Sequence, residues 1–341
     1  TGHTGFKGAW CALWLARMGA KVTGFALAPD RDLNLFEGAV VATGMQSCIG
    51  DLRDRDQIRS VVRTVAPEIV LHMAAQAIVR RAHREPVETV ATNVLGTMHL
   101  LDALRERGAA RVILVVTSDK VYDNADRGLA FREGDPLGGR EIYSASKAAT
   151  EILTRAMALS HFAEGSAIVA TARGGNVIGG GDYAEDRLVP DIVRAVARGE
   201  PVVLRNPDAI RPWQHVLDCV AAYLIYIQAL AANAPIPHAL NVGPEPTSVF
   251  TVRDVAEQIL QGFGSNLGWQ ATTDSNPYEA KELLLDTALS RDRIGWRERL
   301  PGKLAFAATA NWYRAVAQGA SMRDECLMQI NAYMGGSALP S

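Results

Sequence analysis

Apolar residues along this chain fall into short continuous runs that are separated by longer stretches with helical spacing. Residues 68–75 and 111–117 are mostly apolar, and residues 21–25 and 170–173 form shorter runs of the same kind. Continuous apolar runs of this length are typical of strands that are buried on both faces of a parallel sheet. Helical stretches such as 87–107 alternate with them. The pattern predicts an α/β fold with a doubly wound parallel sheet.

The pattern changes after residue 176. A glycine-rich loop at 179–182 leads into a predicted helix, and residues 202–205 form a further short strand. We therefore expect two domains. Residues 1–175 would form the sheet domain, and residues 176–341 would mainly form a smaller C-terminal α/β domain, with part of the chain returning to the sheet.

The chain opens on a glycine-rich turn. Gly2, Gly5 and Gly8 are spaced three apart, and a helix is predicted to follow over 10–18. Such glycines let the backbone approach a diphosphate, and the helix offers its N-terminal amides to the negative charge. A turn of this kind normally follows a strand. We therefore expect further apolar residues upstream of Thr1 in the full gene product.

Composition and charge exclude several classes of function. The chain has 35 Lys and Arg residues against 37 Asp and Glu residues, which gives a net charge of −2. It therefore lacks the excess of basic residues that proteins binding nucleic acid or membrane surfaces usually carry. The four cysteines are scattered without metal-type spacing, and no apolar run is long enough to cross a bilayer. These features predict a cytoplasmic protein that binds no metal ion, nucleic acid or membrane.

The candidate chemistry lies on a predicted helix and at the end of a predicted strand. Tyr143 and Lys147 are four residues apart, so they share one helix face. A nearby ammonium favours phenolate, which predicts a lowered tyrosine pKa and a general base. Taken alone, the pair is better interpreted as a half-buried tyrosine beside a solvated lysine, and two other segments change this interpretation. Ser118, Asp119 and Lys120 follow a buried strand, at the edge where such sheets place their active sites.

Three segments together resemble the extended short-chain dehydrogenase/reductase family, and within it the sugar-nucleotide 4,6-dehydratases. They are TGHTGFKG at residues 1–8, VVTSDK at 115–120 and YSASK at 143–147. The resemblance implies a Rossmann-type sheet, NAD as cofactor, a sugar-nucleotide substrate, and a homodimer or tetramer. Most such dehydratases carry Asp-Glu where this chain has Asp119-Lys120. Asp119-Lys120, the first segment and the sequence RPWQH at 211–215 are all similar to the CDP-glucose branch of these dehydratases.

The resemblance also implies catalytic roles. Tyr143 would remove the proton from the sugar O4, Lys147 would lower the tyrosine pKa and hold the nicotinamide ribose, and Ser118 would bind O4. Asp119 and Lys120 would be the acid and base of the elimination across C5 and C6. Two rival hypotheses remain. A 4-epimerase needs the serine, tyrosine and lysine but no adjacent acid and base, and a dinucleotide-sensing regulator would usually lack the tyrosine or the lysine.

Cofactor-binding residues are implied in the same way, with alternatives. Asp51 is interpreted as an adenine ligand or as part of a helix N-cap, and His72 as structural or catalytic. Asn93 would brace the catalytic lysine or be an exposed helical residue. The residues after the second strand leave NAD and NADP undecided, and the resemblance favours NAD. The implied residues are Gly2, Thr4, Gly5, Phe6, Lys7, Gly8, Asp51, Leu52, Ala74, Ala75, Gln76, Asn93, Tyr143 and Lys147.

Substrate-binding residues are expected mainly after residue 176. Arginines suit a diphosphate because a guanidinium binds its oxygens in a fork. Arg187 has an alternative interpretation as a surface residue paired with Glu185 or Asp186. The expected residues are Asn176, Arg187, Leu188, Arg205, Arg211 and Tyr278.

Overall fold

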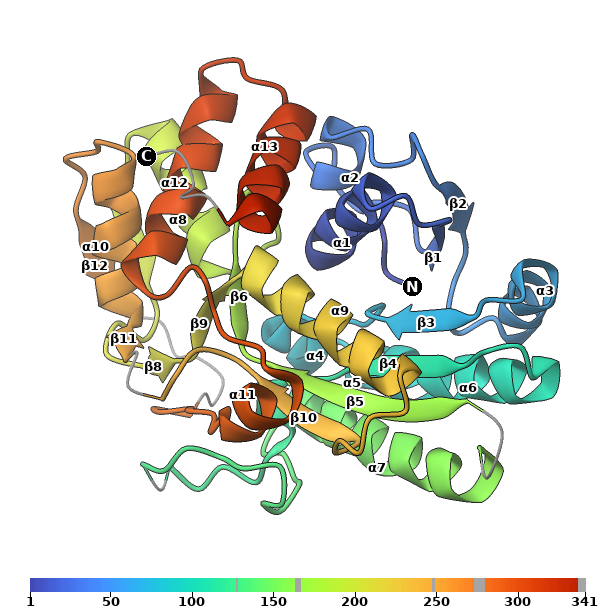
Figure 1. Cartoon of the computed structure of the whole chain (residues 1–341). Helices are drawn as coiled ribbons and strands as arrows, with labels where there is room; N and C mark the ends of the chain where they lie inside the picture. Colours follow the sequence, from blue (N-terminus) through green and yellow to red (C-terminus); the bar gives the residue numbers. More distant parts are fainter. Residues whose placement is uncertain (127, 163–166, 247–248, 273–279, 337–341) are drawn as a thin grey trace.

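The computed structural model describes residues 1–126, 128–162, 167–246, 249–272 and 280–336. At its centre is a four-stranded parallel sheet in the order β10-β5-β4-β3, which confirms the predicted α/β fold (Figure 1). All five residues of β4 are buried, as its unbroken apolar run predicts. The strands are β3 (Ile69–His72), β4 (Val112–Val116), β5 (Ile168–Gly174) and β10 (Ala239–Val242).

A second, two-stranded parallel sheet lies on the β3 side. The first two residues of the chain link the two sheets, because the Thr1 nitrogen donates to the Leu71 carbonyl at 2.8 Å and the Gly2 amide donates to the Phe25 carbonyl at 2.9 Å. This link places the glycine turn between the sheets. The two strands are β1 (Thr23–Ala26) and β2 (Gln46–Ile49).

Helices cover both faces of the central sheet. Leu114 packs in one core cluster with residues of α1 and α9, whereas Ile113 and Val115 pack in another with residues of α3 and α6. Neighbouring strand residues point to opposite faces, so β4 contributes to both layers. Figure 1 shows α9 across the front of the sheet. The helices of this part are α1 (Phe6–Arg17), α2 (Leu35–Gly38), α3 (Arg55–Val65), α4 (Val79–Arg84), α5 (Pro86–Val90), a π-helical turn (Ala91–Leu95), α6 (Gly96–Arg107), a 3₁₀ turn (Asp119–Val121), α7 (Ile142–His161) and α9 (Val216–Ala231).

The remaining C-terminal elements form short sheets and helices beside the carboxyl ends of the central strands. Strand β10 also comes from this half of the chain, and it joins the central sheet beside β5. The division into two domains stays a prediction. The strand pairs are β6 (Asn176–Ile178) with β9 (Trp213–His215), β7 (Val202–Leu204) with β12 (Trp269–Ala271), and β8 (Ile210–Arg211) with β11 (Phe250–Thr251). The helices are α8 (Leu188–Arg198), α10 (Val252–Gly262), α11 (Ala288–Ile294), α12 (Lys303–Ala317) and α13 (Met322–Gly335).

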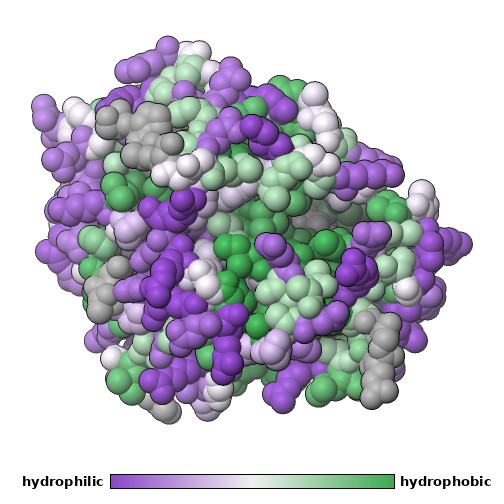
Figure 2. Space-filling view, in the orientation of Figure 1, coloured by the Kyte–Doolittle hydropathy of each residue, from purple (hydrophilic) through white to green (hydrophobic). Residues whose placement is uncertain are grey.

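The surface is mixed in polarity. Figure 2 shows hydrophobic residues over α9 in the middle of this face and hydrophilic residues around its edge. Among the described residues, no helix is both long and apolar enough to cross a membrane. All four cysteines are free thiols, and three of them, Cys11, Cys219 and Cys326, are buried.

Candidate active site

A cavity of about 320 Å³ lies where β4 and β5 end. Segments far apart in the sequence meet there: the residues after β4, the first turns of α7, the end of β5, and the loop before α8. This is the edge at which open parallel sheets bind ligands. Twelve of the residues predicted from the sequence line this cavity: Lys7, Ala75, Ser118, Asp119, Lys120, Tyr143, Lys147, Asn176, Arg187, Leu188, Arg205 and Arg211.

The serine, aspartate and lysine after β4 form one hydrogen-bonded group. The Ser118 hydroxyl donates to Asp119 Oδ1 at 2.9 Å and accepts the Lys120 backbone amide at 3.2 Å. Lys120 Nζ lies 3.2 Å from the same Oδ1 and 3.3 Å from Asn176 Oδ1. Asp119 is 0% exposed, and its Oδ2 has no hydrogen-bond partner among the described residues. One carboxylate oxygen is thus buried without a partner among the described residues.

Helix α7 carries the tyrosine and the lysine. Its N-cap is Glu141, whose carboxylate accepts the backbone amides of Tyr143 and Ser144, both at 2.7 Å. Lys147 Nζ donates to the Val116 carbonyl at the end of β4, at 3.3 Å. Burial, and after it the nearby Lys7, lower the pKa of Lys147 to about 7, against an opposing effect of Glu151. The helix and the strand end are therefore joined at the catalytic candidates.

The predicted lowering of the Tyr143 pKa is wrong for the protein chain itself. Burial raises the pKa of Tyr143 to about 12, although the neighbouring Ser118 side chain and the charge of Arg187 oppose this. Four-residue spacing places Lys147 on the right face, but its ammonium turns to the Val116 carbonyl. Desolvation of the phenol therefore outweighs the expected effect of the ammonium.

The glycine turn has the shape that a dinucleotide diphosphate requires. Gly2 has a φ of +78°, and a Cβ on Gly8 would lie 1.9 Å from the Gly2 carbonyl oxygen, so only glycine fits there. Gly5 is the N-cap of α1 and supplies no side-chain cap, and the first turn contains no acidic residue. The first amides of α1 are left for an anion, which fits NAD at this site. The Thr4 hydroxyl donates to the Leu27 carbonyl at 2.8 Å.

Asn93 belongs to a buried group near the cavity and is not an exposed helical residue. It is 1% exposed, accepts the Gln76 amide at 2.8 Å, and donates to the Ser146 hydroxyl at 2.9 Å. It therefore contacts the neighbour of Lys147 and not the lysine itself. The Gln76 side chain bonds back to the backbone of Ile78, so it shapes this loop.

Other predicted cofactor residues are engaged within the protein. Asp51 pairs with Arg53 at 2.6 Å, and the N-cap of α3 is Asp54. Leu52 is buried in the core. Both ring nitrogens of His72 contact threonine hydroxyls, at 2.8 and 2.9 Å, and His72 does not line the cavity. These contacts support the structural interpretation of His72.

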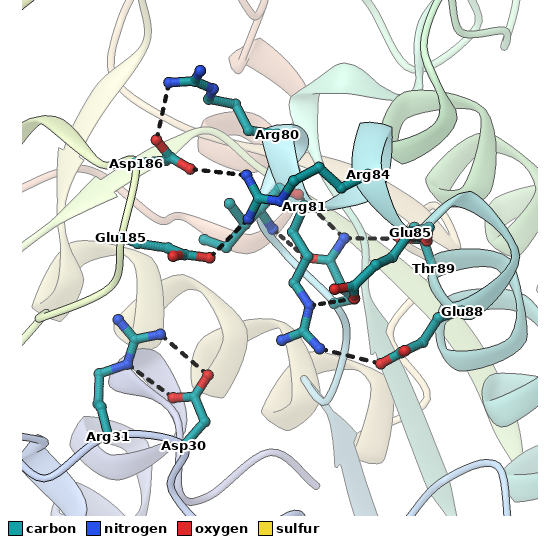
Figure 3. A network of polar contacts seen from close by, with 12 residues as sticks. Asp30, Arg31, Arg80, Arg81, Arg84, Glu85, Glu88, Thr89, Glu185 and Asp186 are labelled. Atoms are coloured by element: carbon teal, nitrogen blue, oxygen red, sulfur yellow. Dashed lines mark hydrogen bonds and ion pairs between the residues drawn. The ribbon is translucent and has the colours of Figure 1, made fainter.

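Charged residues of α4 and of the loop before α8 form a network of ion pairs (Figure 3), and Arg80 and Asp186 of this network line the cavity. Asp186, which has a φ of +57°, accepts from Arg80 of α4 at 3.3 Å and from Arg205 at 2.7 Å. Arg84, also on α4, lies 3.2 Å from Glu185 and 3.8 Å from Asp186. These ion pairs join α4 to the loop before α8, and we call them the α4 clasp.

The sequence did not single out Arg80 or Asp186 as site residues. The only signal was the position of Arg80, just beyond the end of a buried strand, and no sequence pattern shows its partner. Arg187 pairs with Asp182 at 3.3 Å, and not with Glu185 or Asp186 as its alternative interpretation expected. Arg211 is buried and donates to the Ile210 carbonyl at 2.8 Å. Tyr278 lies outside the described residues.

Comparison with known proteins agrees with this geometry. Residues 1–243 match the model of the NAD dependent epimerase/dehydratase family. The chain is 38% identical to CDP-glucose 4,6-dehydratase of Salmonella typhimurium, over 99% of this chain and 96% of that protein. It is 31% identical to dTDP-glucose 4,6-dehydratase of Streptomyces antibioticus, over 78% of this chain and 75% of that protein.

Solved structures show the same fold. The Thermus thermophilus UDP-glucose 4-epimerase in complex with NAD superimposes with a TM-score of 0.79 at 24% identity, covering 92% of this chain and 97% of that one. The dTDP-glucose 4,6-dehydratase of Bacillus anthracis, also with NAD, gives a TM-score of 0.76 at 19% identity, covering 95% and 97%. Sequence, fold and site geometry agree, and the chain belongs to the NAD dependent epimerase/dehydratase family.

Proposed function

We propose that this protein is an NAD-dependent sugar-nucleotide 4,6-dehydratase, a hydro-lyase that converts CDP-glucose to CDP-4-keto-6-deoxyglucose in deoxysugar biosynthesis. The observation that carries the proposal is the Asp119–Lys120 pair beside Ser118, Tyr143 and Lys147 in one cavity. A 4-epimerase needs no such acid and base. The 38% identity to a CDP-glucose 4,6-dehydratase supports the choice of nucleotide.

Bound NAD would supply a reversible hydride acceptor for oxidation at the sugar C4 and reduction at C6. The amides of the glycine turn would hold its diphosphate, and Lys147 its nicotinamide ribose. Tyr143 removes the O4 proton while Ser118 binds the same oxygen. Because burial raises the pKa of Tyr143, the tyrosine needs its charged neighbours to act as a base.

Oxidation at C4 makes the C5 proton acidic, so elimination then needs a base at C5 and an acid at the C6 hydroxyl. Lys120 is the proposed base and Asp119 the proposed acid. Their side chains are 3.2 Å apart, so the two groups can act on neighbouring atoms of one bound sugar.

The diphosphate of the substrate is assigned to Arg187 and Arg211, which both line the cavity. Asn176, Leu188 and Arg205 lie around the same space, and Tyr278 is proposed from the sequence alone. Arg211→Ala should raise KM far more than it lowers kcat, because it removes a contact made equally in the ground and transition states. The opposite pattern would place Arg211 in the chemistry.

The proposal is tested by incubating the purified protein with CDP-glucose, dTDP-glucose and GDP-mannose and following the formation of a 4-keto-6-deoxy sugar. We expect product from CDP-glucose, without net consumption of NAD because the hydride returns to the same sugar. A sugar epimerised at C4 without loss of water would instead identify a 4-epimerase. Bound NAD without turnover of any sugar nucleotide would favour a sensor.

A further inference from the structure

Glu151 lies one helical turn after Lys147 on α7, and its carboxylate is 4% exposed. Both of its oxygens are engaged. Oε1 accepts the hydroxyl of Thr117, and Oε2 accepts the hydroxyl of Thr171 at 2.9 Å and the guanidinium of Arg173 at 3.0 Å. One carboxylate therefore joins α7 to the residue that follows β4 and to two residues of β5.

Arg173 carries this connection onward. Its second terminal nitrogen donates to the Tyr122 hydroxyl at 2.9 Å, and that hydroxyl donates to Asn241 of β10 at 2.6 Å. The Tyr122 ring stacks on Phe131 with the ring centres 4.8 Å apart. Tyr122 is thus fixed from three directions.

Thr117 and Tyr122 flank the segment that carries Ser118, Asp119 and Lys120. The segment is therefore held at both ends by a single buried ion pair. Glu151 of this pair belongs to α7, the helix that carries Tyr143 and Lys147, and Arg173 belongs to β5.

We propose that the Glu151–Arg173 pair sets the distance between the Ser118–Lys120 segment and the Tyr143–Lys147 face of α7, and that Glu151 and Thr117 are positioning residues. This inference rests on the proposed function for its kinetic tests. An ion pair taken out of water often adds little to stability compared with apolar packing. Fixed geometry between two parts of the site accounts for its burial better than stability does.

The main test compares two matched substitutions, Thr117→Val and Thr171→Val. Each removes one buried hydroxyl that donates to Glu151, and the two threonines are equally buried. Only Thr117 is joined by a peptide bond to the Ser118–Lys120 segment. We expect Thr117→Val to lower kcat about tenfold to a hundredfold with little change in KM, since a displacement of about 1 Å can cost that much. Thr171→Val should keep kcat close to the wild-type value.

A second test uses Glu151→Gln, which keeps the shape and removes the charge. Glu151 raises the pKa of Lys147, so its loss should move that pKa below about 7. The alkaline limb of the kcat profile should then shift to lower pH. The rate at which an amine-specific acylating reagent modifies Lys147, measured against pH without substrate, reports the same shift.

Equal losses of kcat in the two threonine variants, in parallel with equal losses of melting temperature, would overturn the proposal and leave a purely structural network. Crystal structures of both variants separate this from a failure of the proposed function. Displacement of the Asp119 carboxylate relative to the Tyr143 hydroxyl is expected in Thr117→Val only. That result would stand even if the wild-type protein turned over none of the sugar nucleotides.

Discussion

At the scale of single residues, Asp119 has the most informative surroundings. It is fully buried, one oxygen is held by Ser118 and Lys120, and the other faces no partner among the described residues. An unpartnered buried oxygen is costly unless a ligand satisfies it. The C6 hydroxyl of the substrate would be that ligand.

Asp119→Asn should separate oxidation from elimination. Removal of the acid leaves the oxidation at C4 intact, so reduced cofactor and the 4-keto hexose should accumulate before any 6-deoxy product forms. General acids contribute about a hundredfold to ten-thousandfold, and product formation should fall by that factor. The absorbance of the reduced nicotinamide follows the reaction, and Tyr143→Phe is the control that should show no such absorbance.

Lys120→Met should also block elimination, and in addition abolish exchange of the C5 proton with solvent deuterium. Mass spectrometry of the recovered sugar measures this exchange. If the variant retains both exchange and turnover, the base is a different residue. His72 is then a poor candidate, because both of its ring nitrogens contact threonines away from the cavity.

Glu298 predicts a pH dependence of stability. Burial, and then the charges of Asp218 and Glu245, raise its pKa to about 7. Since the folded pKa lies above the unfolded one, near 4.5, the group stabilises the fold below that range and this contribution is lost as pH rises to about 7. Glu298→Gln should therefore melt at a higher temperature than the wild type at pH 8. The exposed Glu200→Gln is the control, and an unchanged melting temperature in Glu298→Gln would contradict the assignment.

Residue chemistry was predictable where it depends on local spacing. Tyr143, Lys147 and the Ser118–Lys120 segment were identified from short motifs, and the structure brings them together. Glu151 was not, because its partners come from segments that are adjacent only after folding. The Tyr143 pKa was mispredicted for a similar reason, since burial of the phenol cannot be seen in a four-residue spacing.

At the scale of elements, the α4 clasp joins α4 to the loop before α8, and part of that loop lines the cavity. Arg31 also contacts this loop, because its guanidinium donates to the Tyr183 carbonyl at 2.9 Å. The loop is thus attached to two segments of the N-terminal half. Asp186 holds a left-handed backbone conformation there, which is uncommon for an aspartate.

Arg80→Ala should loosen this loop. Partly exposed ion pairs contribute up to about 1 kcal/mol, so we expect KM for the sugar nucleotide to rise severalfold with little change in kcat. The KM of the variant should also depend less on salt than that of the wild type. Arg55→Ala is the matched control, because it removes a surface pair with Asp102 outside the cavity lining. Equal effects of both substitutions would contradict a role for the clasp.

Element boundaries were predictable where the apolar pattern is long. The apolar run at 111–117 predicted the strand β4, and the spacing of apolar residues at 87–107 predicted helical structure there. The sequence did not predict that this stretch contains a π-helical turn over Ala91–Leu95, which carries Asn93. A π-helical turn depends on contacts made after folding, here those of Asn93 with Gln76 and Ser146.

At the scale of the whole molecule, we propose a homodimer that forms through α5, α6 and α7. Val87 is 80% exposed and Leu159 is 73% exposed; Ile152 of α7 and Leu95 of the π-helical turn between α5 and α6 are also exposed. Apolar side chains gathered on neighbouring helices are typical of an interface. The resemblance to the extended short-chain family favours the same helices.

Light scattering should therefore give the mass of a dimer for the wild type at micromolar concentration. Leu159→Glu places a charge in the proposed interface and should shift the protein to monomer, whereas Leu304→Glu on the exposed surface of α12 should not. A monomeric wild type would contradict the proposal.

The overall sheet was predictable because three of its strands, β3, β4 and β5, lie in apolar runs of the sequence. The pairing of β10 with β5 was expected only in outline, as part of the chain returning to the sheet. The position of that strand could not be read from the sequence, since residues 239–242 are too short a run to distinguish from other apolar segments.

The α4 clasp has a thermodynamic consequence. Arg80 lies on the helix that follows β3, and β3 ends beside the glycine turn that is expected to bind NAD. Asp186 lies next to Arg187, which is expected to bind the substrate diphosphate. The Arg80–Asp186 ion pair therefore connects the expected cofactor side of the cavity with its expected substrate side. If one ligand favours the closed clasp, reciprocity requires that each ligand change the affinity of the other by the same factor. NAD titrated with and without the sugar nucleotide gives that factor, and Arg80→Ala should bring it towards one.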